Sequence, residues 1–533
     1  MPGSNSKMKV LISDSLSQEG LAILRGAKGL EVDVHESIPP DKLKEMIKDY
    51  DALIVRSGTK VTRDIIQNAV KMRVIGRAGV GLDNVDVDAA SERGIIVMNA
   101  PEGNTIATAE HTMSLLLSLA RKVPQANESL RQNKWDRKGL MGLELYGKTL
   151  GIVGLGRVGG EVAKRAQSFG MPILAYDPYL SADKANKLNI ELSSFDDLLS
   201  RSDFITVHTP LTKETKYIIG AKEFEKMKKG VRILNCARGG IINEKALEQA
   251  ILSGKVAGAA LDVFEEEPPK NHPLLKLDQV IATPHLGAST NEAQVNVAID
   301  IAKQVVDVLL DRGIRNAVNY PSVDGEVLKV IRPYLKLAES IGALQAQLAD
   351  GRISTLKVRY SGEVTNYDTA PITVALLKGL LTPIMGETVN YVNAQVLAKG
   401  RDIKVIESKT SEVEEFANVI ATEVKTDKLR SIVEGTLFSK DNPRIVKIDE
   451  FYVDAVPQGH MVIVFNKDVP GIIGTIGTIL GRNKINIAGM TFGRRKEGGR
   501  AITVLNVDSL VPDEVIREIS SAENMYDARQ ITL

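Results

Sequence analysis

The sequence predicts an α/β protein with two doubly wound parallel-sheet domains, followed by an α+β middle domain and a ferredoxin-like C-terminal domain. Three observations carry this prediction. Short apolar runs alternate with helical segments from residue 8 to residue 288, which is the pattern of parallel βαβ units. The alternation is interrupted by a long helical segment and restarts near residue 147. Residues 457–533 follow the order strand, helix, strand, strand, helix, strand, which is that of a split βαβ fold.

Each element of the two parallel sheets rests on a local pattern. The expected strands are short apolar runs, as in sheets that are covered on both faces, and the helices have apolar residues every three to four positions. The strands are expected at residues 8–14, 30–35, 51–57, 72–79, 148–156, 172–178, 204–210, 231–237, 257–263 and 280–287, and the shorter helices at 17–27, 40–50 and 63–70.

Four domains are expected, and the first is discontinuous. Residues 8–102 and 289–318 would form the first, because a second long helical segment leads back to it after the last parallel strand. Residues 103–288 would form the second, residues 319–456 the middle domain and residues 457–533 the last. The two long helical segments span 104–123 and 291–313, and the middle domain shows helices at 327–348 and 371–384 and strands at 354–362 and 444–456.

The bulk composition excludes several classes of protein. The chain of 533 residues is too long for a single hydrophobic core. A typical domain length of roughly 100–200 residues suggests three or four domains. The net charge of +1 gives no field that would favour nucleic acid or a membrane surface. A single cysteine fits a reducing compartment, and no apolar run approaches the ~20 residues of a membrane span. We therefore expect a cytoplasmic multidomain protein with no nucleic-acid partner, no membrane partner and no metal.

A glycine-rich turn follows the strand at which the alternation restarts. In "GLGRVG", Gly154 permits a tight turn, Gly156 lets the backbone approach a pyrophosphate, and Gly159 lets the next helix lie against the strand. Asp177 closes the following strand, near the spacing at which a carboxylate binds the ribose hydroxyls, and the next two residues supply no cation for a 2′-phosphate. We predict that this Rossmann-like domain binds NAD rather than NADP; the alternative is a glycine-rich turn without a nucleotide.

Three polar side chains follow strand ends in the second parallel sheet. Arg238 comes after the apolar run 231–234, Glu267 is in "DVFEEEPP", and His285 is in "IATPHLGAS". In an open parallel sheet such positions face the ligand crevice. Together they suit oxidation of a 2-hydroxy acid, with the guanidinium binding the carboxylate, the imidazole taking the hydroxyl proton and the carboxylate orienting the imidazole. Taken singly, each has an alternative role: a surface ion pair, a structural histidine or a solvated acidic turn.

The remaining histidines and the only cysteine are weaker candidates. His208 follows a strand beside the cofactor turn and could line it, whereas His35 and His111 lie in periodic segments that suggest structural or solvated roles. Cys236 has no neighbouring histidine or cysteine that would activate it as a nucleophile, so we expect it to lie beside the nicotinamide.

Five motifs occur in a characteristic order: "GLGRVG", "VHTPL", "NCARGG", "ALDVFEEEPP" and "PHLGAS". With them the chain resembles the D-isomer-specific 2-hydroxyacid dehydrogenases. The tail, with "NKDVPG" and "INIAGM", resembles an ACT domain, and the segment "YVNAQVLAKGRDI" is similar to the allosteric substrate-binding domain of the long family members. The resemblance implies NAD-dependent oxidation of 3-phosphoglycerate to 3-phosphohydroxypyruvate, the first step of phosphorylated L-serine synthesis, in a homo-oligomer.

The resemblance also implies roles for individual residues. It implies that Arg238 binds the substrate carboxylate, that His285 is the acid–base residue and that Glu267 is the partner of this histidine. It also implies that Arg157 and Val158 contact the pyrophosphate. The residues that it places around the cofactor, mostly at the nicotinamide end, are Val80, His208, Thr209, Pro210, Cys236, Ala237, Arg238, Asp262, His285, Gly287 and Ala288.

Recognition of a substrate phosphate needs further cations. Arg56 and Arg77 both follow apolar strands of the first domain, opposite the cofactor domain. The segment "NKWDRKG" adds two cations, which the resemblance places in an arm that reaches a neighbouring subunit; the alternative is a solvated basic loop. The residues predicted to bind substrate are Arg56, Ser57, Arg77, Gly79, Arg137 and Lys138.

The ACT resemblance implies L-serine feedback at an interface between two such domains. Asn466, Asp468 and Asn486 occupy the ligand positions, although family members often carry histidine and asparagine at the first two. All three side chains can hydrogen-bond an amino acid. A different ligand and simple dimerisation are the alternatives.

Two other functions are compatible with the same catalytic fold. A reductase of another 2-oxo acid, such as hydroxypyruvate, uses the same chemistry, but the paired arginines and the two added domains argue against it. An NAD-sensing transcriptional corepressor needs partner-recruiting surfaces and tails, whereas this chain has domains that resemble metabolic regulators.

Overall fold

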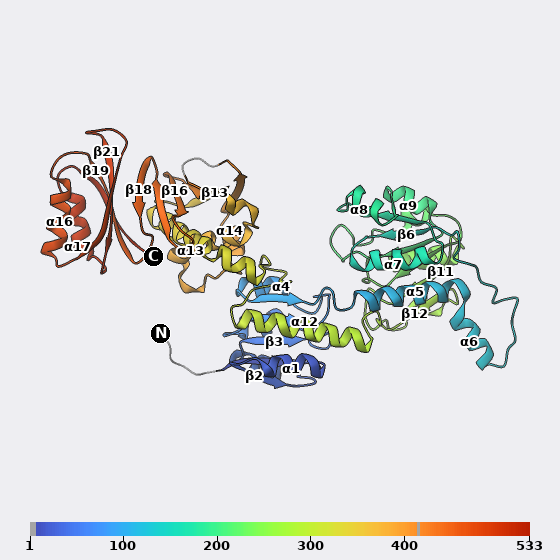
Figure 1. Cartoon of the computed structure of the whole chain (residues 1–533). Helices are drawn as coiled ribbons and strands as arrows, with labels where there is room; N and C mark the ends of the chain where they lie inside the picture. The colour runs from blue at the N-terminus through green and yellow to red at the C-terminus, as the bar shows by residue number, and fades with distance from the viewer. Residues whose placement is uncertain (1–6, 413–415) are drawn as a thin grey trace.

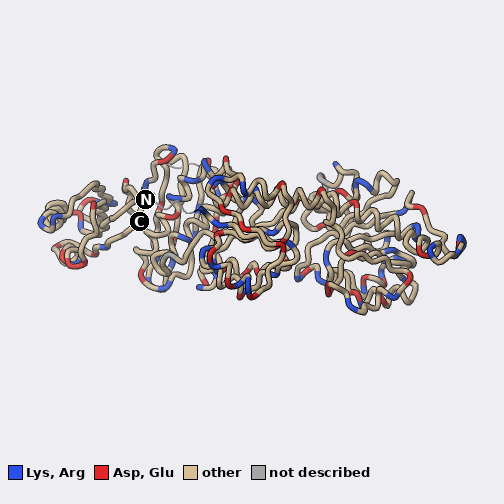
Figure 2. Tube along the Cα trace, turned by 90° about the horizontal axis from the view of Figure 1, so that it is seen from below, with Lys and Arg blue, Asp and Glu red and all other residues tan. Residues whose placement is uncertain are grey.

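The computed structural model describes residues 7–412 and 416–533. It contains four sheets that follow one another along an elongated molecule, with the sheet around β6 at one end and the sheet around β19 and β21 at the other (Figure 1). Basic and acidic residues are interspersed along the whole trace (Figure 2), as expected from the net charge. Within the described part of the chain, no helix is long and apolar enough to cross a membrane.

The first sheet has five parallel strands in the order β2-β1-β3-β4-β5. Helix α12 (Asn291–Leu309) returns from the second sheet to cover one face of it, and Ile301 and Val305 of this helix lie against the backbone of Gly76. The chain therefore enters this unit twice. Its other elements are β1 (Met8–Ile12), α1 (Gln18–Gly26), β2 (Leu30–Val34), α2 (Pro40–Met46), β3 (Ala52–Val55), α3 (Arg63–Asn68), β4 (Val74–Arg77), α4 (Val87–Glu92) and β5 (Ile96–Asn99).

The second sheet has seven parallel strands in the order β12-β11-β10-β9-β6-β7-β8. The direction of winding reverses between β6 and β9, and this switch point is where such sheets bind ligands. The strands are β6 (Leu150–Val153), β7 (Ile173–Tyr176), β8 (Glu191–Leu192), β9 (Phe204–Val207), β10 (Val231–Asn235), β11 (Val256–Leu261) and β12 (Val280–Ala282), and the helices are α5 (Thr105–Arg121), α6 (Val123–Arg131), α7 (Arg157–Ser168), α8 (Ala182–Lys187), α9 (Phe195–Arg201), α10 (Ala221–Lys226) and α11 (Glu244–Leu252).

The middle sheet is mixed, with six strands in the order β14-β13-β15-β16-β17-β18. The long strand predicted at 444–456 is instead the hairpin of β17 and β18, because Asp449 adopts a left-handed turn with a φ of +51°. The elements are α13 (Gly325–Leu348), β13 (Ile353–Gly362), α14 (Ala370–Met385), α15 (Ala394–Gly400), β14 (Lys404–Thr410), β15 (Asn418–Thr426), β16 (Arg430–Leu437), β17 (Pro443–Ile448) and β18 (Phe451–Ala455).

The C-terminal sheet is antiparallel, in the order β20-β21-β19-β22. Side chains on β19 alternate between its two faces: Val462 and Val464 pack on helices α16 and α17, while Met461 and Ile463 share a core with Leu337 of the middle domain. One apolar core therefore joins the last two sheets. The elements are β19 (His460–Lys467), α16 (Ile472–Arg482), β20 (Ile487–Arg494), β21 (Arg500–Val507), α17 (Asp513–Ser521) and β22 (Met525–Thr532).

Candidate active site

A cavity of about 480 Å³ lies at the carboxyl ends of the strands in the second sheet, between this sheet and the loop after β4. It includes the switch point, since the start of α7 after β6 and the residues after β9 both line it. Many of the predicted cofactor residues meet here. Those that line the cavity are Val80, Arg157, Val158, His208, Thr209, Pro210, Cys236, Ala237, Arg238, Asp262, His285, Gly287 and Ala288.

The glycine-rich turn has the geometry that a dinucleotide requires. Gly154 has a φ of +92°, and a Cβ there would come within 2.8 Å of the His208 carbonyl oxygen. A Cβ at Gly159 would come within 2.2 Å of the Gly154 carbonyl oxygen, whereas the space beside Gly156 is open. Gly156 caps helix α7 without a side chain, so the first N–H groups of the helix are available to an anion. Asp177 accepts hydrogen bonds from the backbone N–H groups of Leu155 and Tyr179 (both 2.9 Å), which fixes its carboxylate beside the turn.

His285 and Glu267 form the predicted pair. Nδ1 of His285 lies 2.7 Å from Oε2 of Glu267, and the Phe264 N–H donates to the other carboxylate oxygen at 3.2 Å. Since Nδ1 is engaged, Nε2 is the nitrogen that remains for proton transfer. The imidazole is 48% exposed, so a substrate can reach it.

Arg238 is held in place by two hydrogen bonds. Its Nε donates to Oδ2 of Asp83 at 3.2 Å, and its Nη1 donates to the Ala237 carbonyl oxygen at 2.7 Å. Nη2 lies against Gly81, where a Cβ would approach it to 2.0 Å. Asp83 and Gly81 both belong to the loop after β4, so this arginine bridges the two parallel-sheet units.

His208 and Cys236 have strongly shifted acidities. Burial lowers the pKa of His208 to about 4, and its Nε2 lies 3.0 Å from the Thr206 hydroxyl, so the ring is neutral near pH 7. Burial raises the pKa of Cys236 to about 12, so its thiol keeps its proton. Neither residue is therefore equipped to exchange protons with a substrate at neutral pH, which leaves His285.

The predicted substrate residues occupy two places. Arg56 follows β3 and Arg77 ends β4, so both lie at the same edge of the first sheet, with Ser57 and Gly79 directly after them. None of the six predicted substrate residues lines the cavity itself. Gly79 directly precedes Val80, which does line it, whereas Arg137 and Lys138 lie in the exposed segment after α6.

The three predicted effector residues do not lie together in one copy of the chain. Asn466 lies near the C-terminal end of β19, where Asp468 forms an ion pair with Arg494 at 2.9 Å. Asn486 precedes β20 at the opposite end of the sheet and donates to Asp508 at 2.7 Å. A single ligand could bridge both ends only if a second copy brought them together.

Several residues around the cavity are absent from the sequence-based prediction. Asp83 contacts Arg238 across 155 positions, and His111 contacts Asp262 across 151, so no local pattern marks either contact. A partial signal existed for Asp83, because it lies three positions after the predicted Val80. The additional residues that line the cavity are Leu82, Asp83, Pro101, Asn104, Thr108 and Leu211. Gly81, whose backbone the sequence offered for phosphate recognition together with Gly79 and Val80, lines it as well.

Comparison with known proteins agrees with this architecture. Residues 113–287 match the model of the NAD binding domain of D-isomer specific 2-hydroxyacid dehydrogenases, residues 330–449 that of the D-3-phosphoglycerate dehydrogenase intervening domain, and residues 460–524 that of the ACT domain. The chain is 47% identical over 527 residues to D-3-phosphoglycerate dehydrogenase of Methanocaldococcus jannaschii. This match covers 99% of this chain and 100% of that protein. The chain belongs to the D-3-phosphoglycerate dehydrogenase family. The relative from Bacillus subtilis is 43% identical and covers 98% of this chain and 99% of that protein.

Solved structures match more than half of this family member. D-lactate dehydrogenase of Aquifex aeolicus, in complex with NAD and lactic acid, is 28% identical with a TM-score of 0.53; the match covers 59% of this chain and 100% of that one. The TT0316 protein of Thermus thermophilus is 36% identical with a TM-score of 0.54, over 58% of this chain and 100% of that one. The chain is an NAD-dependent dehydrogenase, with the doubly wound sheets and the ACT domain that the sequence predicted.

Proposed function

We propose that the protein oxidises 3-phosphoglycerate to 3-phosphohydroxypyruvate with NAD, as the first step of L-serine biosynthesis. The observation that carries the substrate assignment is the cation cluster at the edge of the first sheet. The Nε atom of Arg77 is buried and has no hydrogen-bond partner among the described residues. Burial and the positive charges of Arg238 and Arg56 lower the pKa of Arg77, and the carboxylates of Asp83 and Asp14 offset this only in part. Cations in such proximity are stabilised by an anion, and a phosphate on the substrate supplies one.

Residues of the chain itself orient the substrate and take up the proton that the reaction releases. The N–H groups of Arg238 that do not bind Asp83 or the Ala237 carbonyl oxygen, those of Nη2 above all, bind the substrate carboxylate. This contact fixes the C2 atom of the substrate beside the cofactor. Nε2 of His285 takes the C2 hydroxyl proton, and bound NAD would supply the acceptor for the hydride that leaves C2. Glu267 stabilises the resulting imidazolium through Nδ1. In the reverse direction the imidazolium returns the proton to the carbonyl oxygen.

The substrate assignment predicts a preference for the phosphorylated 2-oxo acid. We expect kcat/KM with 3-phosphohydroxypyruvate to exceed that with hydroxypyruvate by at least about 10-fold, the value of one charge-assisted hydrogen bond. Arg77→Met should remove most of this preference without slowing hydroxypyruvate reduction. Arg63→Met is the matched control, because that arginine pairs with Glu92 on the surface of the first unit. NADH oxidation measures kcat/KM for the wild type and both variants with each acid, and equal kcat/KM for both acids in the wild type would overturn the substrate assignment.

The Glu267 contact predicts a pH effect. Burial raises the pKa of Glu267, but the hydrogen bond and charge of His285 outweigh it, so the pKa lies below its usual value and the carboxylate is ionised at neutral pH. Glu267→Gln removes that charge and destabilises the imidazolium. We expect the alkaline limit of reduction and the acid limit of oxidation both to move to lower pH, by about one unit or more. Profiles of kcat/KM against pH, with the exposed neighbour Glu266→Gln as control, check this; coincident profiles for wild type and Glu267→Gln would contradict it.

We further propose that L-serine acts at an interface between two C-terminal domains and that the protein is a homo-oligomer. The separation of Asn486 from Asn466 and Asp468 along one sheet supports a site shared by two copies. The exposed segment that carries Arg137 and Lys138 supports a contact with a neighbouring subunit. The same NADH assay with added L-serine tests the feedback, and an unchanged rate would remove it while leaving the catalytic assignment intact.

The division into domains is also a proposal. We place the boundaries at 8–102 with 289–318, 103–288, 319–456 and 457–533, supported by the return of α12 to the first sheet. The single cysteine, which fits a reducing compartment, supports a cytoplasmic location.

A further inference from the structure

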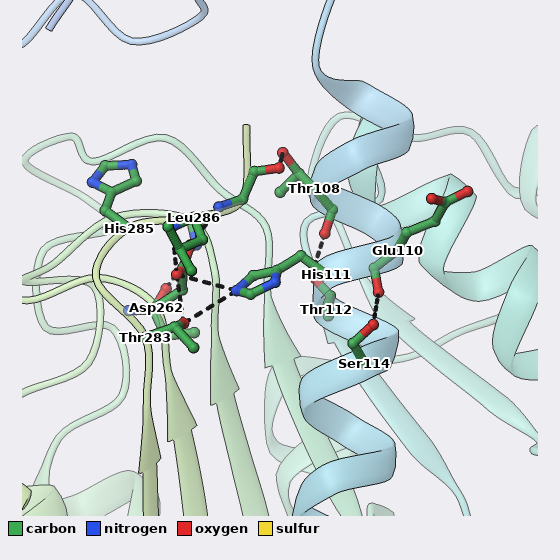
Figure 3. Close-up of polar contacts among 12 residues, drawn as sticks. Thr108, Glu110, His111, Thr112, Ser114, Asp262, Thr283, His285 and Leu286 are labelled. Atoms are coloured by element: carbon green, nitrogen blue, oxygen red, sulfur yellow. Dashed lines mark hydrogen bonds and ion pairs between the residues drawn. The ribbon is translucent and has the colours of Figure 1, made fainter. Parts of the chain in front are cut away.

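A buried carboxylate lies beneath the turn that carries His285 (Figure 3). Asp262, directly after β11, is 1% exposed. Its Oδ1 accepts hydrogen bonds from the Thr283 hydroxyl at 2.6 Å and the Leu286 N–H at 2.7 Å, and its Oδ2 accepts from the Gly287 N–H at 2.8 Å. Its backbone carbonyl accepts from the His285 N–H at 2.9 Å. One residue therefore holds three successive N–H groups of the turn.

Helix α5 supplies a further donor to this carboxylate. Nε2 of His111 lies 3.1 Å from Oδ1 of Asp262 and 3.1 Å from Oγ1 of Thr283. Thr283 donates its hydroxyl hydrogen to Asp262, and an ionised carboxylate only accepts, so Nε2 of His111 carries the hydrogen that completes the triangle. Although burial raises the pKa of Asp262, the hydrogen bonds from His111, Thr283 and Leu286 lower it below its usual value, so the carboxylate is ionised.

The turn requires this support because of its backbone. His285 has a φ of +55°, a left-handed conformation that is unfavourable for a residue with a side chain and persists where surrounding contacts enforce it. Small displacements of a reacting group lower rates strongly, by about 100-fold for about 1 Å. His111 itself does not line the cavity, so it can act only through Asp262 and Thr283.

We propose that His111 is a positioning residue for the dehydrogenase reaction. Its Nε2–H ties helix α5 to Asp262 and thereby fixes the turn on which the acid–base imidazole of His285 is presented. The role rests on the proposed function of His285, but it does not depend on which 2-oxo acid is the substrate.

Two polar substitutions of His111, which differ little in size, distinguish a hydrogen-bonding role of this side chain from a role in packing alone. In His111→Gln the amide nitrogen can reach the position of Nε2, whereas in His111→Asn it reaches only the position of Nδ1. We expect His111→Asn to lower kcat by about 10- to 100-fold with KM for the 2-oxo acid within about threefold of wild type, and His111→Gln to keep kcat within about threefold. Ser114→Ala, whose hydroxyl donates to the Glu110 carbonyl one turn along the same helix (Figure 3), should match the wild type.

The experiment measures NADH oxidation with whichever 2-oxo acid the wild type reduces, so an error in the substrate assignment appears in the wild type and not in the variant ratios. Thermal melting with NADH checks that each variant is folded. Wild-type kcat in His111→Asn would overturn the proposal, as would equal losses in the Asn and Gln variants. If His111→Asn does not fold, His111→Leu takes its place, because it also removes the Nε2–H contact with Asp262 while it keeps an apolar side chain on the helix; a wild-type kcat in that variant would equally overturn the role.

Discussion

His285→Ala is expected to lower kcat by about 10²–10⁴-fold in both directions, the usual contribution of general acid–base catalysis. The reason is geometric. Glu267 occupies Nδ1 of His285, burial keeps His208 neutral, and Cys236 keeps its proton. The two carboxylates at the cavity are engaged, Asp83 by Arg238 and Asp262 by the turn that carries His285, so Nε2 of His285 is the group placed to exchange a proton with the substrate near pH 7. Binding of the substrate carboxylate depends on Arg238, so KM should change much less than kcat.

Steady-state rates of NADH oxidation and of NAD reduction, each measured against substrate concentration, give kcat and KM separately for the two directions. His460→Ala is the matched control, because that imidazole lies at the start of β19, 3.3 Å from the Thr532 hydroxyl in the C-terminal sheet. A kcat within threefold of wild type for His285→Ala would remove this residue from the proton path. A large rise in KM with kcat unchanged would make it a binding residue instead.

The parallel sheets were predictable because their strands are buried on both faces. The runs "ALIV", "LGIV" and "FITV" form β3, β6 and β9, with every residue buried. The strand β5 and the helix α4 before it were not predicted. Both are short, and an apolar run of four residues does not distinguish a strand from part of a helix. The helix predicted at 104–123 ends at Arg121, because Lys122 adopts a φ of +52°.

The catalytic pair was predictable for a different reason. The carboxyl ends of parallel strands meet at one edge, so polar residues just after β10, β11 and β12 had to lie near each other. The 2.7 Å contact between His285 and Glu267 follows from that topology. His111 was not predictable, since a histidine at apolar spacing on a helix has the same local pattern whether its partner is a solvent molecule or a buried carboxylate. The partner becomes visible only when α5 is packed against β11 and β12.

The last two sheets show a limit of reading domains from sequence. The odd-numbered apolar residues of β19, such as Met461 and Ile463, predict a covered face but do not identify what covers it. That face packs on the middle domain through α13, and Arg529 of β22 donates to the Leu348 carbonyl oxygen at 2.7 Å. The C-terminal sheet and the middle domain are therefore joined by apolar packing and by this hydrogen bond.

Arg238→Lys is expected to lower kcat/KM by at least about 100-fold, although the positive charge is kept. The guanidinium uses Nε to bind Asp83 and Nη1 to bind the Ala237 carbonyl oxygen, so the substrate carboxylate meets a fork whose plane is already fixed. A lysine ammonium is a point charge on a flexible stem. It can reach Asp83 or the substrate, but it cannot hold one while orienting the other.

The split between the two kinetic constants tests this account. If the variant only attracted the substrate carboxylate less strongly, KM would rise. If it no longer oriented the substrate, kcat would fall, because C2 would not be aligned for hydride transfer. Both constants should change in Arg238→Lys. Arg232→Lys is the control: that arginine lies on β10, the strand that precedes Arg238, over the ring of Phe204 at 5.6 Å and outside the cavity, and its kinetics should stay within about threefold of wild type. Wild-type kcat in Arg238→Lys, even with a raised KM, would show that charge and not the fixed fork is what the reaction needs from this position.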